Sequence, residues 1–196
     1  GREGLDYAAR WTTPAASTPT YKAMKLYRNY DGGNSGFGNT SVAAGVPNPD
    51  TLSAFAALRA ADGALTVMVV NKALAGSTPV SLALANFSAA SAAQAWQLTS
   101  ANTITRLADV AVAGASLAAS VPPQSITLFV IPAAAPAAAL RTHVSGAGSD
   151  ANVAHACNAA HPCRSFAAAL GVTATGGEIL ALDSAAYGKV TIDRSV

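Results

Sequence analysis

The sequence predicts a mainly β protein built around an antiparallel β-sandwich of seven to eight strands. Short apolar segments, several of them alternating with polar residues, recur between residues 52 and 131 and are separated by turns. No helix-length segment lies between them, as a parallel sheet would require. Only 11% of the residues are charged, and Ala, Ser, Thr and Gly are abundant. This composition is more typical of a secreted β protein than of a cytosolic helical one.

Composition divides the chain into four parts. Residues 1–46 hold one predicted helix, and residues 47–132 hold the strands of the sandwich. Residues 133–141 form an Ala/Pro-rich linker, and the run Ile131–Leu140 has no charge and no periodicity, which predicts a semi-stiff tether. Residues 142–196 are Gly-rich and contain both cysteines and all three histidines. We therefore consider function separately for the parts before and after the linker.

The first element is a helix predicted over Thr20–Tyr30, with Thr20 as its cap and a stop at Asp31–Asn34. Its apolar face is expected to consist of Ala23, Leu26, Tyr27 and Tyr30.

Eight strands are expected after this helix. Asp62 and Gly63 predict a hairpin turn between the first two strands. Trp96 and Leu98 alternate, so we expect them in the sandwich core. The strands are predicted at Leu52–Ala60, Leu65–Asn71, Val80–Leu84, Ala95–Thr99, Thr103–Leu107, Val110–Val112, Leu117–Val121 and Ser125–Ile131.

The C-terminal part is expected to hold a short helix and two strands. The helix is predicted over Arg164–Leu170 with Ser165 as its cap, and the strands over Glu178–Asp183 and Val190–Ile192.

Cys157 and Cys163 have five residues between them and are flanked by His155 and His161. A disulfide, free thiols and a metal site are the three interpretations. We favour the disulfide, because this spacing is not a recurrent zinc pattern. Closing so small a loop would stabilise the fold by about 2 kcal/mol and would indicate an oxidising compartment.

No complete catalytic constellation is found in the sequence. Asp31, Asp50, Asp62 and Asp109 lie in turn contexts, where carboxylates accept hydrogen bonds from the backbone. Glu3 and Asp6 form one close acidic pair. In the other, Glu178 and Asp183 are five residues apart and would point to opposite faces of a strand. His143, Ser145 and Asp150 form a triad only on paper. We predict no catalytic residues, no cofactor and no metal.

Charge and hydropathy exclude two classes of partner. The formal net charge is +2 and no basic block is present, so we expect no nucleic acid. No apolar run approaches the length of about 18 residues that spans a bilayer, so we expect no membrane insertion. The chain starts at Gly1, which suggests a processed product or a fragment.

Aromatic side chains are the remaining candidates for a binding role. Trp11, Tyr30 and Phe37 lie in the first forty residues, together with Tyr21 and Tyr27. Such rings stack on the apolar faces of sugars, so we take the first three as candidate carbohydrate-binding residues. The alternative, which is more common for rings at helical spacing, is packing of the helix.

Two segments at the start of the chain resemble the end of the barrel in glycoside hydrolase family 44, which comprises endoglucanases and xyloglucanases. These segments are Gly1–Pro14 and Tyr21–Gly32. Leu52–Pro132, with Leu65–Lys72 and Pro123–Phe129, resembles the C-terminal β-sandwich of the same family. The resemblance covers about residues 1–132.

This resemblance implies that residues 1–46 are a barrel-end remnant, with Trp11 at the rim where barrel enzymes keep their sites. In the family two catalytic glutamates come from earlier barrel strands, which are absent from this sequence.

The tail resembles the start of pectate-lyase-like right-handed β-helix proteins. The matching segments are Val144–Asn152, Pro162–Leu170 and Gly176–Asp183. The resemblance implies a capping helix followed by about one coil, so residues 142–196 would be a partial β-helix.

Three functions remain open. We favour a non-catalytic accessory β-sandwich, with carbohydrate binding as its candidate role, derived from a plant-polysaccharide hydrolase acting on β-1,4-glucan or xyloglucan. The alternatives are an endo-β-1,4-glucanase and a structural or oligomerisation module. The expected partner is a β-glucan or a related plant polysaccharide, and exposed strand edges predict a homo-oligomer. The expected location is secreted and extracellular.

Overall fold

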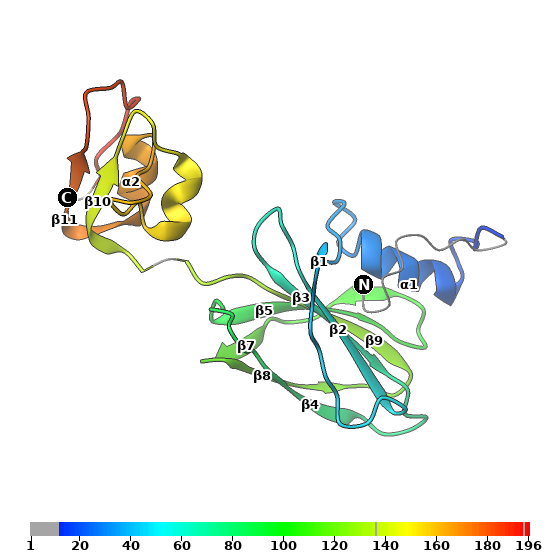
Figure 1. Cartoon of the computed structure of the whole chain (residues 1–196). Coiled ribbons are helices and arrows are strands. Elements are labelled where there is room, and N and C mark those ends of the chain that lie inside the picture. Colours follow the sequence, from blue (N-terminus) through cyan, green and yellow to red (C-terminus); the bar gives the residue numbers. More distant parts are fainter. Residues whose placement is uncertain (1–11, 136, 194) are drawn as a thin grey trace. The chain divides into compact units, whose positions relative to one another are not determined.

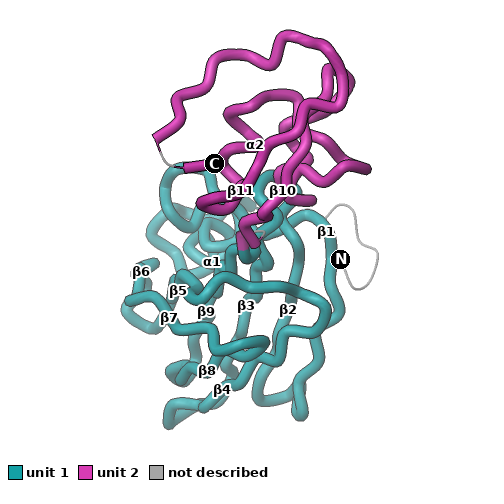
Figure 2. The backbone as a smooth tube through the Cα atoms, turned by 90° about the vertical axis from the view of Figure 1, so that its left-hand side faces the viewer, with its two compact units in different colours: residues 1–134 teal, residues 135–196 magenta. Residues whose placement is uncertain are grey.

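The computed structural model describes residues 12–135, 137–193 and 195–196. The chain divides into two compact units, residues 1–134 (unit 1) and residues 135–196 (unit 2), which Figure 2 shows in different colours. Within the described ranges, no helix has the length and apolar character needed to cross a membrane.

Unit 1 is a curled antiparallel sheet (Figure 1). Its strand order is β1-β2-β3-β9-β5-β7-β8-β4, and β6 pairs with β5. Every strand pair in this sheet is antiparallel, which confirms the predicted mainly β class. The strands are β1 (Thr40–Val42), β2 (Leu52–Leu58), β3 (Leu65–Asn71), β4 (Thr78–Ala83), β5 (Ala92–Leu98), β6 (Ile104–Arg106), β7 (Val110–Ala113), β8 (Ser116–Val121) and β9 (Ser125–Ile131).

The curl makes a sandwich, because β4, β7 and β8 fold over one face of β3, β9 and β5. Buried side chains from both layers form the first apolar cluster, which includes Val69 on β3, Leu117 on β8 and Phe129 on β9. The eight predicted strands correspond to β2–β9, and β1 is an additional short edge strand. Asp62 and Gly63 lie in the predicted turn between β2 and β3, and Gly63 has a positive φ of 68° that favours glycine.

Helix α1 (Pro19–Arg28) covers the opposite face of the sheet (Figure 1). The cap is Thr18 and not Thr20, because the Thr18 hydroxyl accepts a hydrogen bond from the Tyr21 backbone N–H. Pro19 then occupies the first turn, where its missing N–H has no cost.

The second apolar cluster lies between α1 and the sheet. Leu26 of α1 is fully buried there, against Met68 of β3 and Leu128 of β9. Trp96 and Leu98 also belong to this cluster. Their predicted place in the sandwich core was therefore wrong, although they do share a face. Alternation identifies residues on a common face of a strand, but it does not say which face is covered by a helix and which by a second layer.

Unit 2 is built from β10 (Ala139–Val144), the 3₁₀ helix η1 (Asp150–His155), α2 (Phe166–Val172) and β11 (Thr173–Ala181). The two strands pair in parallel. The Ser165 hydroxyl accepts from the Ala168 N–H, which confirms it as the cap of α2. Residues 190–192 form no strand, so that prediction was wrong. β10 begins inside the segment 133–141 that was predicted as linker.

Cys157 and Cys163 form the predicted disulfide, with their Cα atoms 5.0 Å apart. Both cysteines are fully buried and belong to the apolar cluster of unit 2, together with Val144, Ala169 and Val172. The cross-link is therefore the centre of this small core.

Candidate functional site

The candidate site of unit 1 is the surface formed by α1 and the loop that follows it. Tyr30 lies under this surface, with 5% of its area exposed. Its hydroxyl accepts a hydrogen bond of 2.7 Å from Arg59, and its ring centroid lies 5.3 Å from that of Trp96. Arg59 also donates to the Gly36 carbonyl at 3.2 Å. Tyr30 and Arg59 thus hold the loop against the sheet.

Phe37 and Tyr27 form a stacked pair on this surface. Their ring centroids are 5.1 Å apart and their planes differ by 26°. The backbone keeps them together, because the Phe37 N–H donates to the Tyr27 carbonyl at 2.8 Å. Gly38 follows, and a Cβ there would lie 2.6 Å from the Ala57 carbonyl oxygen, so only glycine lets the loop approach β2 so closely.

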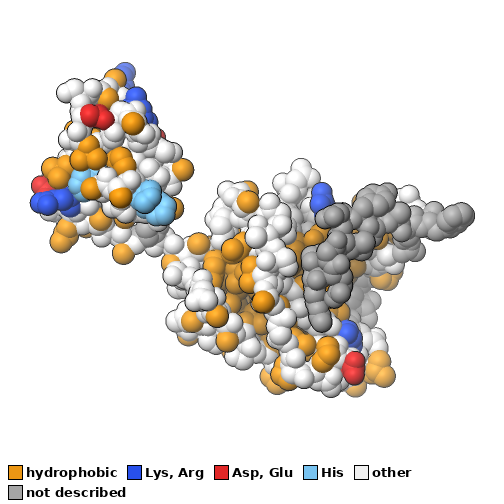
Figure 3. Space-filling view, in the orientation of Figure 1, with side chains coloured by type: hydrophobic (Ala, Val, Ile, Leu, Met, Phe, Trp, Pro, Cys, Tyr) orange, Lys and Arg blue, Asp and Glu red, His pale blue; other side chains and the backbone are white. Residues whose placement is uncertain are grey.

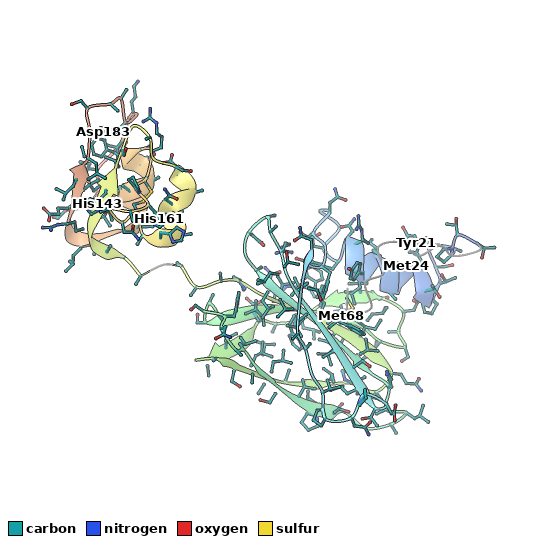
Figure 4. All side chains as sticks on the ribbon, viewed as in Figure 1. Tyr21, Met24, Met68, His143, His161 and Asp183 are labelled. Atoms are coloured by element: carbon teal, nitrogen blue, oxygen red, sulfur yellow. A yellow bond between two sulfur atoms is a disulfide. The ribbon has the colours of Figure 1, made fainter. Side chains whose placement is uncertain are left out.

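The exposed side of α1 carries a stripe of large side chains. Tyr21, Met24 and Tyr27 follow one another at intervals of three and are 37%, 47% and 45% exposed. Figure 4 shows Tyr21 and Met24 on α1 and Met68 on the sheet side of the helix. Tyr27 was expected to be buried with Leu26. Helical periodicity could not show that Phe37 would cover one side of the Tyr27 ring and leave the side chain partly exposed.

An open depression of about 470 Å³ lies between the start of α1 and the ends of β5 and β9. Leu98 and Ile126 contribute apolar surface, and the lining carries hydroxyl and amide groups but no charged side chain. Asn102 donates to the Ser17 carbonyl at 2.6 Å, while its own side-chain oxygen is buried without a partner in the described structure. A neutral, hydrogen-bonding lining suits a neutral polar ligand better than an ion.

Three of the carboxylates in the described part of unit 1 are engaged in local contacts. Asp31 accepts from the backbone N–H groups of residues 33 and 35 at 2.8 and 3.2 Å. Asp62 pairs with Arg59 at 2.7 Å, and Asp109 pairs with Arg106. These contacts agree with the structural role predicted for turn aspartates.

Hydrogen bonds depress the pKa of two of these groups. The Arg59 guanidinium holds the pKa of the Asp62 carboxyl below its usual value, although partial burial opposes the effect. Hydrogen bonding by Ser35 and by the turn backbone lowers the pKa of Asp31 in the same way. A lowered pKa keeps a carboxyl ionised, which is the opposite of what a general acid for glycoside cleavage needs at neutral pH.

Asp183 and Asp150 of unit 2 are also hydrogen-bonded. Asp183 accepts from the Ser145 hydroxyl at 2.7 Å, from the Gly146 N–H and from the Tyr187 hydroxyl. Its pKa is lowered, chiefly by Tyr187 and then by Ser145. Asp150 accepts from the backbone of Arg164 and from Ser165.

His143, Ser145 and Asp150 of unit 2 therefore do not come together as a catalytic triad. Ser145 is bonded to Asp183 and not to His143, while Asp150 lies with Ser165 near the start of α2. Sequence separation concealed the contact between Ser145 and Asp183, which the pairing of β10 with β11 creates. Within the described residues, no three His, Cys, Asp or Glu side chains cluster as metal ligands.

Trp11 lies outside the described residues. The predicted carbohydrate-binding role of Trp11, Tyr30 and Phe37 stays a prediction.

Comparison with known proteins identifies what the chain resembles. The crystal structure of CelM2, a bifunctional glucanase-xylanase from a metagenome library, matches 68% of this chain with 63% sequence identity and a TM-score of 0.67. A glycoside hydrolase family 44 endoglucanase from Clostridium acetobutylicum matches 67% of the chain with 26% identity and a TM-score of 0.62. The similarity to family 44 is confirmed.

Further relatives support the same similarity. A family 44 xyloglucanase from Paenibacillus polymyxa matches 58% of the chain with 29% identity and a TM-score of 0.55. Endoglucanase A of Paenibacillus lautus is 37% identical over 73 residues. No family model matches the chain. The resemblance of the tail to a right-handed β-helix stays a prediction.

The chain spans only part of these relatives. It covers 26% of CelM2, 27% of the Clostridium enzyme and 10% of Endoglucanase A.

Proposed function

We propose that unit 1 is a non-catalytic accessory β-sandwich of a plant-polysaccharide hydrolase, and that it contacts β-1,4-glucan or xyloglucan through the aromatic surface of α1. The observation that carries the proposal is the 63% identity to a glucanase-xylanase over 68% of the chain, in which Asp31, Asp62 and Asp109 are engaged with turn backbone or arginines. A glycosidase needs two carboxylates on either side of one bond, about 5–9.5 Å apart.

The stacked pair of Tyr27 and Phe37 supports the binding part of the proposal. Sugar rings present flat C–H faces that pack on aromatic rings. Because Phe37 covers one side of the Tyr27 ring and 45% of Tyr27 is exposed, the pair offers a ring that is held in place before a ligand arrives. Pre-organised rings lose little conformational entropy on binding. Tyr30 and Trp96 form the layer beneath them.

The test is affinity gel electrophoresis of the full chain in gels containing xyloglucan or carboxymethylcellulose, with a polysaccharide-free gel as reference. We expect retardation in the polysaccharide gels and no release of reducing sugar in the same mixtures. Tyr27→Leu removes the ring and is expected to weaken binding about three- to tenfold. Tyr27→Phe keeps the ring and is the matched control, with binding expected to stay close to that of the parent chain.

Two results would overturn this proposal. Migration that is identical in all gels would remove the binding role. Release of reducing sugar that is lost in Glu3→Gln or Glu178→Gln would favour the alternative of an endo-β-1,4-glucanase.

A structural or oligomerisation module is the second candidate function. The observation that favours it is the exposed stripe of Tyr21, Met24 and Tyr27, which offers apolar area to a protein surface as well as to a sugar. The sheet also ends in β1 and β4, whose outer edges pair with no other strand among the described residues. Light scattering together with the affinity gels distinguishes the cases, since the module predicts a mass above that of one chain without retardation by polysaccharide.

A secreted, extracellular location is part of the proposal. The buried disulfide of unit 2 supports it, because disulfides persist in oxidising compartments.

A further inference from the structure

We propose that His155 and His161 of unit 2 together bind a divalent transition-metal ion of the borderline class, such as Cu²⁺, Ni²⁺ or Zn²⁺. The two imidazole rings are stacked, with centroids 4.5 Å apart and planes differing by 25°. Both side chains are exposed. Figure 3 shows histidine atoms at the surface of unit 2, and Figure 4 labels His161 there.

The ring nitrogens of this pair are free to act as ligands. Within the described residues, no hydrogen bond or ion pair engages the imidazole of either histidine. Neutral imidazole nitrogen is the commonest protein ligand for these metals. The proposal therefore concerns a two-ligand site completed by water, and not a closed structural site of four protein ligands.

The separation of the rings suits a shared ion. Metal–nitrogen bonds of about 2.0–2.1 Å bring two ligating nitrogens to within roughly 3–3.5 Å of each other. The ring centroids are 4.5 Å apart, and rotation of the two exposed side chains would direct one in-plane nitrogen lone pair of each ring at a shared ion.

The backbone between the two histidines is held by local contacts. Residues 156 and 157 adopt left-handed φ values of 50° and 47°, which turn the chain after η1. The side-chain oxygen of Asn158 accepts from the backbone N–H groups of Ala160 and His161, each at 3.0 Å. The Cys157–Cys163 disulfide closes the same segment.

Strand β10 anchors this loop on both sides of the disulfide. The His143 backbone N–H donates to the Cys157 carbonyl at 2.7 Å, and the His143 carbonyl accepts from the Cys163 N–H at 2.9 Å. Both ligands therefore sit on one rigid turn. Binding of the second nitrogen becomes intramolecular, which raises the affinity above that of a single histidine.

Metal titration of the full chain by calorimetry tests the proposal, with Cu²⁺, Ni²⁺ and Zn²⁺ as probes and Mg²⁺ as the hard-cation control. We expect one ion per chain, the tightest binding for Cu²⁺ and none for Mg²⁺. His155→Gln and His161→Gln are each expected to weaken Cu²⁺ binding at least tenfold. The double variant measures the background from all other donors.

His143→Gln is the matched control, because His143 is the third histidine of the chain and its Nδ1 is enclosed. It is expected to leave the affinity unchanged. Electron paramagnetic resonance of the Cu²⁺ complex should show two imidazole nitrogens in the parent chain and one in each single variant. Independent sites, with halved stoichiometry and unchanged affinity in the single variants, would overturn the proposal. An equal loss of affinity in His143→Gln would also overturn it.

Discussion

The two units of this chain are stabilised by different means. Unit 1 has two apolar clusters, one between the layers of the sandwich and one under α1. Unit 2 has one cluster of five buried residues, two of which are the disulfide cysteines. Small folds bury a smaller fraction of their surface, so a cross-link compensates for a thin core. An alanine-rich sequence can therefore be stabilised either by large apolar clusters, as in unit 1, or by a small core with a disulfide, as in unit 2.

This difference can be followed unit by unit in the intact chain. Both tryptophans lie in residues 1–134, so tryptophan fluorescence reports on unit 1. All three histidines lie in residues 135–196, so the proton NMR signals of the imidazole rings report on unit 2.

The largest expected effect is that of Phe129→Ala in unit 1. Phe129 is 1% exposed and packs in the cluster between the layers of the sandwich. Loss of the ring leaves a cavity and should lower the free energy of unfolding by about 3–5 kcal/mol. Urea denaturation followed by tryptophan fluorescence measures this loss, and the imidazole signals of unit 2 should keep their own transition.

Phe55→Ala is the matched control, because Phe55 is 50% exposed. It should cost clearly less than Phe129→Ala. Equal losses in the two variants would mean that the core of unit 1 is not where its stability resides.

An intermediate effect is expected when the cross-link of unit 2 is removed. Replacing Cys157 and Cys163 together by alanine should destabilise unit 2 by about 2 kcal/mol, because the unfolded chain regains the freedom of the closed loop. The imidazole signals in a urea titration measure the change. Reduction of the parent chain with dithiothreitol should give a similar shift. A shift of the tryptophan transition instead would contradict the independence of the two units.

The smallest expected effect is the pH dependence that Asp62 gives to unit 1. Because Arg59 holds the folded-state pKa of Asp62 below its unfolded value, the pair stabilises the fold above the unfolded pKa. That contribution is lost as the pH falls through the folded pKa, which Arg59 lowers below the usual value of an aspartate. The Asp62 side chain is 49% exposed, so solvent screening limits the contribution to about 0.5 kcal/mol.

Urea denaturation at pH 3 and pH 5 measures this dependence. Asp62→Asn should flatten it for the tryptophan transition of unit 1. Asp183→Asn, which removes a carboxyl whose pKa is also lowered, should flatten only the transition of unit 2. A steeper pH dependence in Asp62→Asn would contradict the conclusion that Arg59 lowers the folded-state pKa of Asp62.

Local patterns in the sequence determined most of the secondary structure. The short apolar segments predicted β3 and β9 at the bounds found, and Asp62 with Gly63 predicted the hairpin. Ser165 predicted the start of α2, and the spacing of the cysteines favoured the disulfide. These signals depend on neighbours within a few residues, so they can be read without knowledge of the fold.

The tertiary structure alone decided which side chains meet. It placed Trp96 under α1, stacked Phe37 on Tyr27 and joined Ser145 to Asp183. It also placed the rings of His155 and His161 face to face. Each of these contacts depends on how a loop closes or how strands pair across a long stretch of chain. Periodicity shows only which residues share a face of a helix or strand. Which element packs on that face depends on how the loops bring distant parts of the chain together.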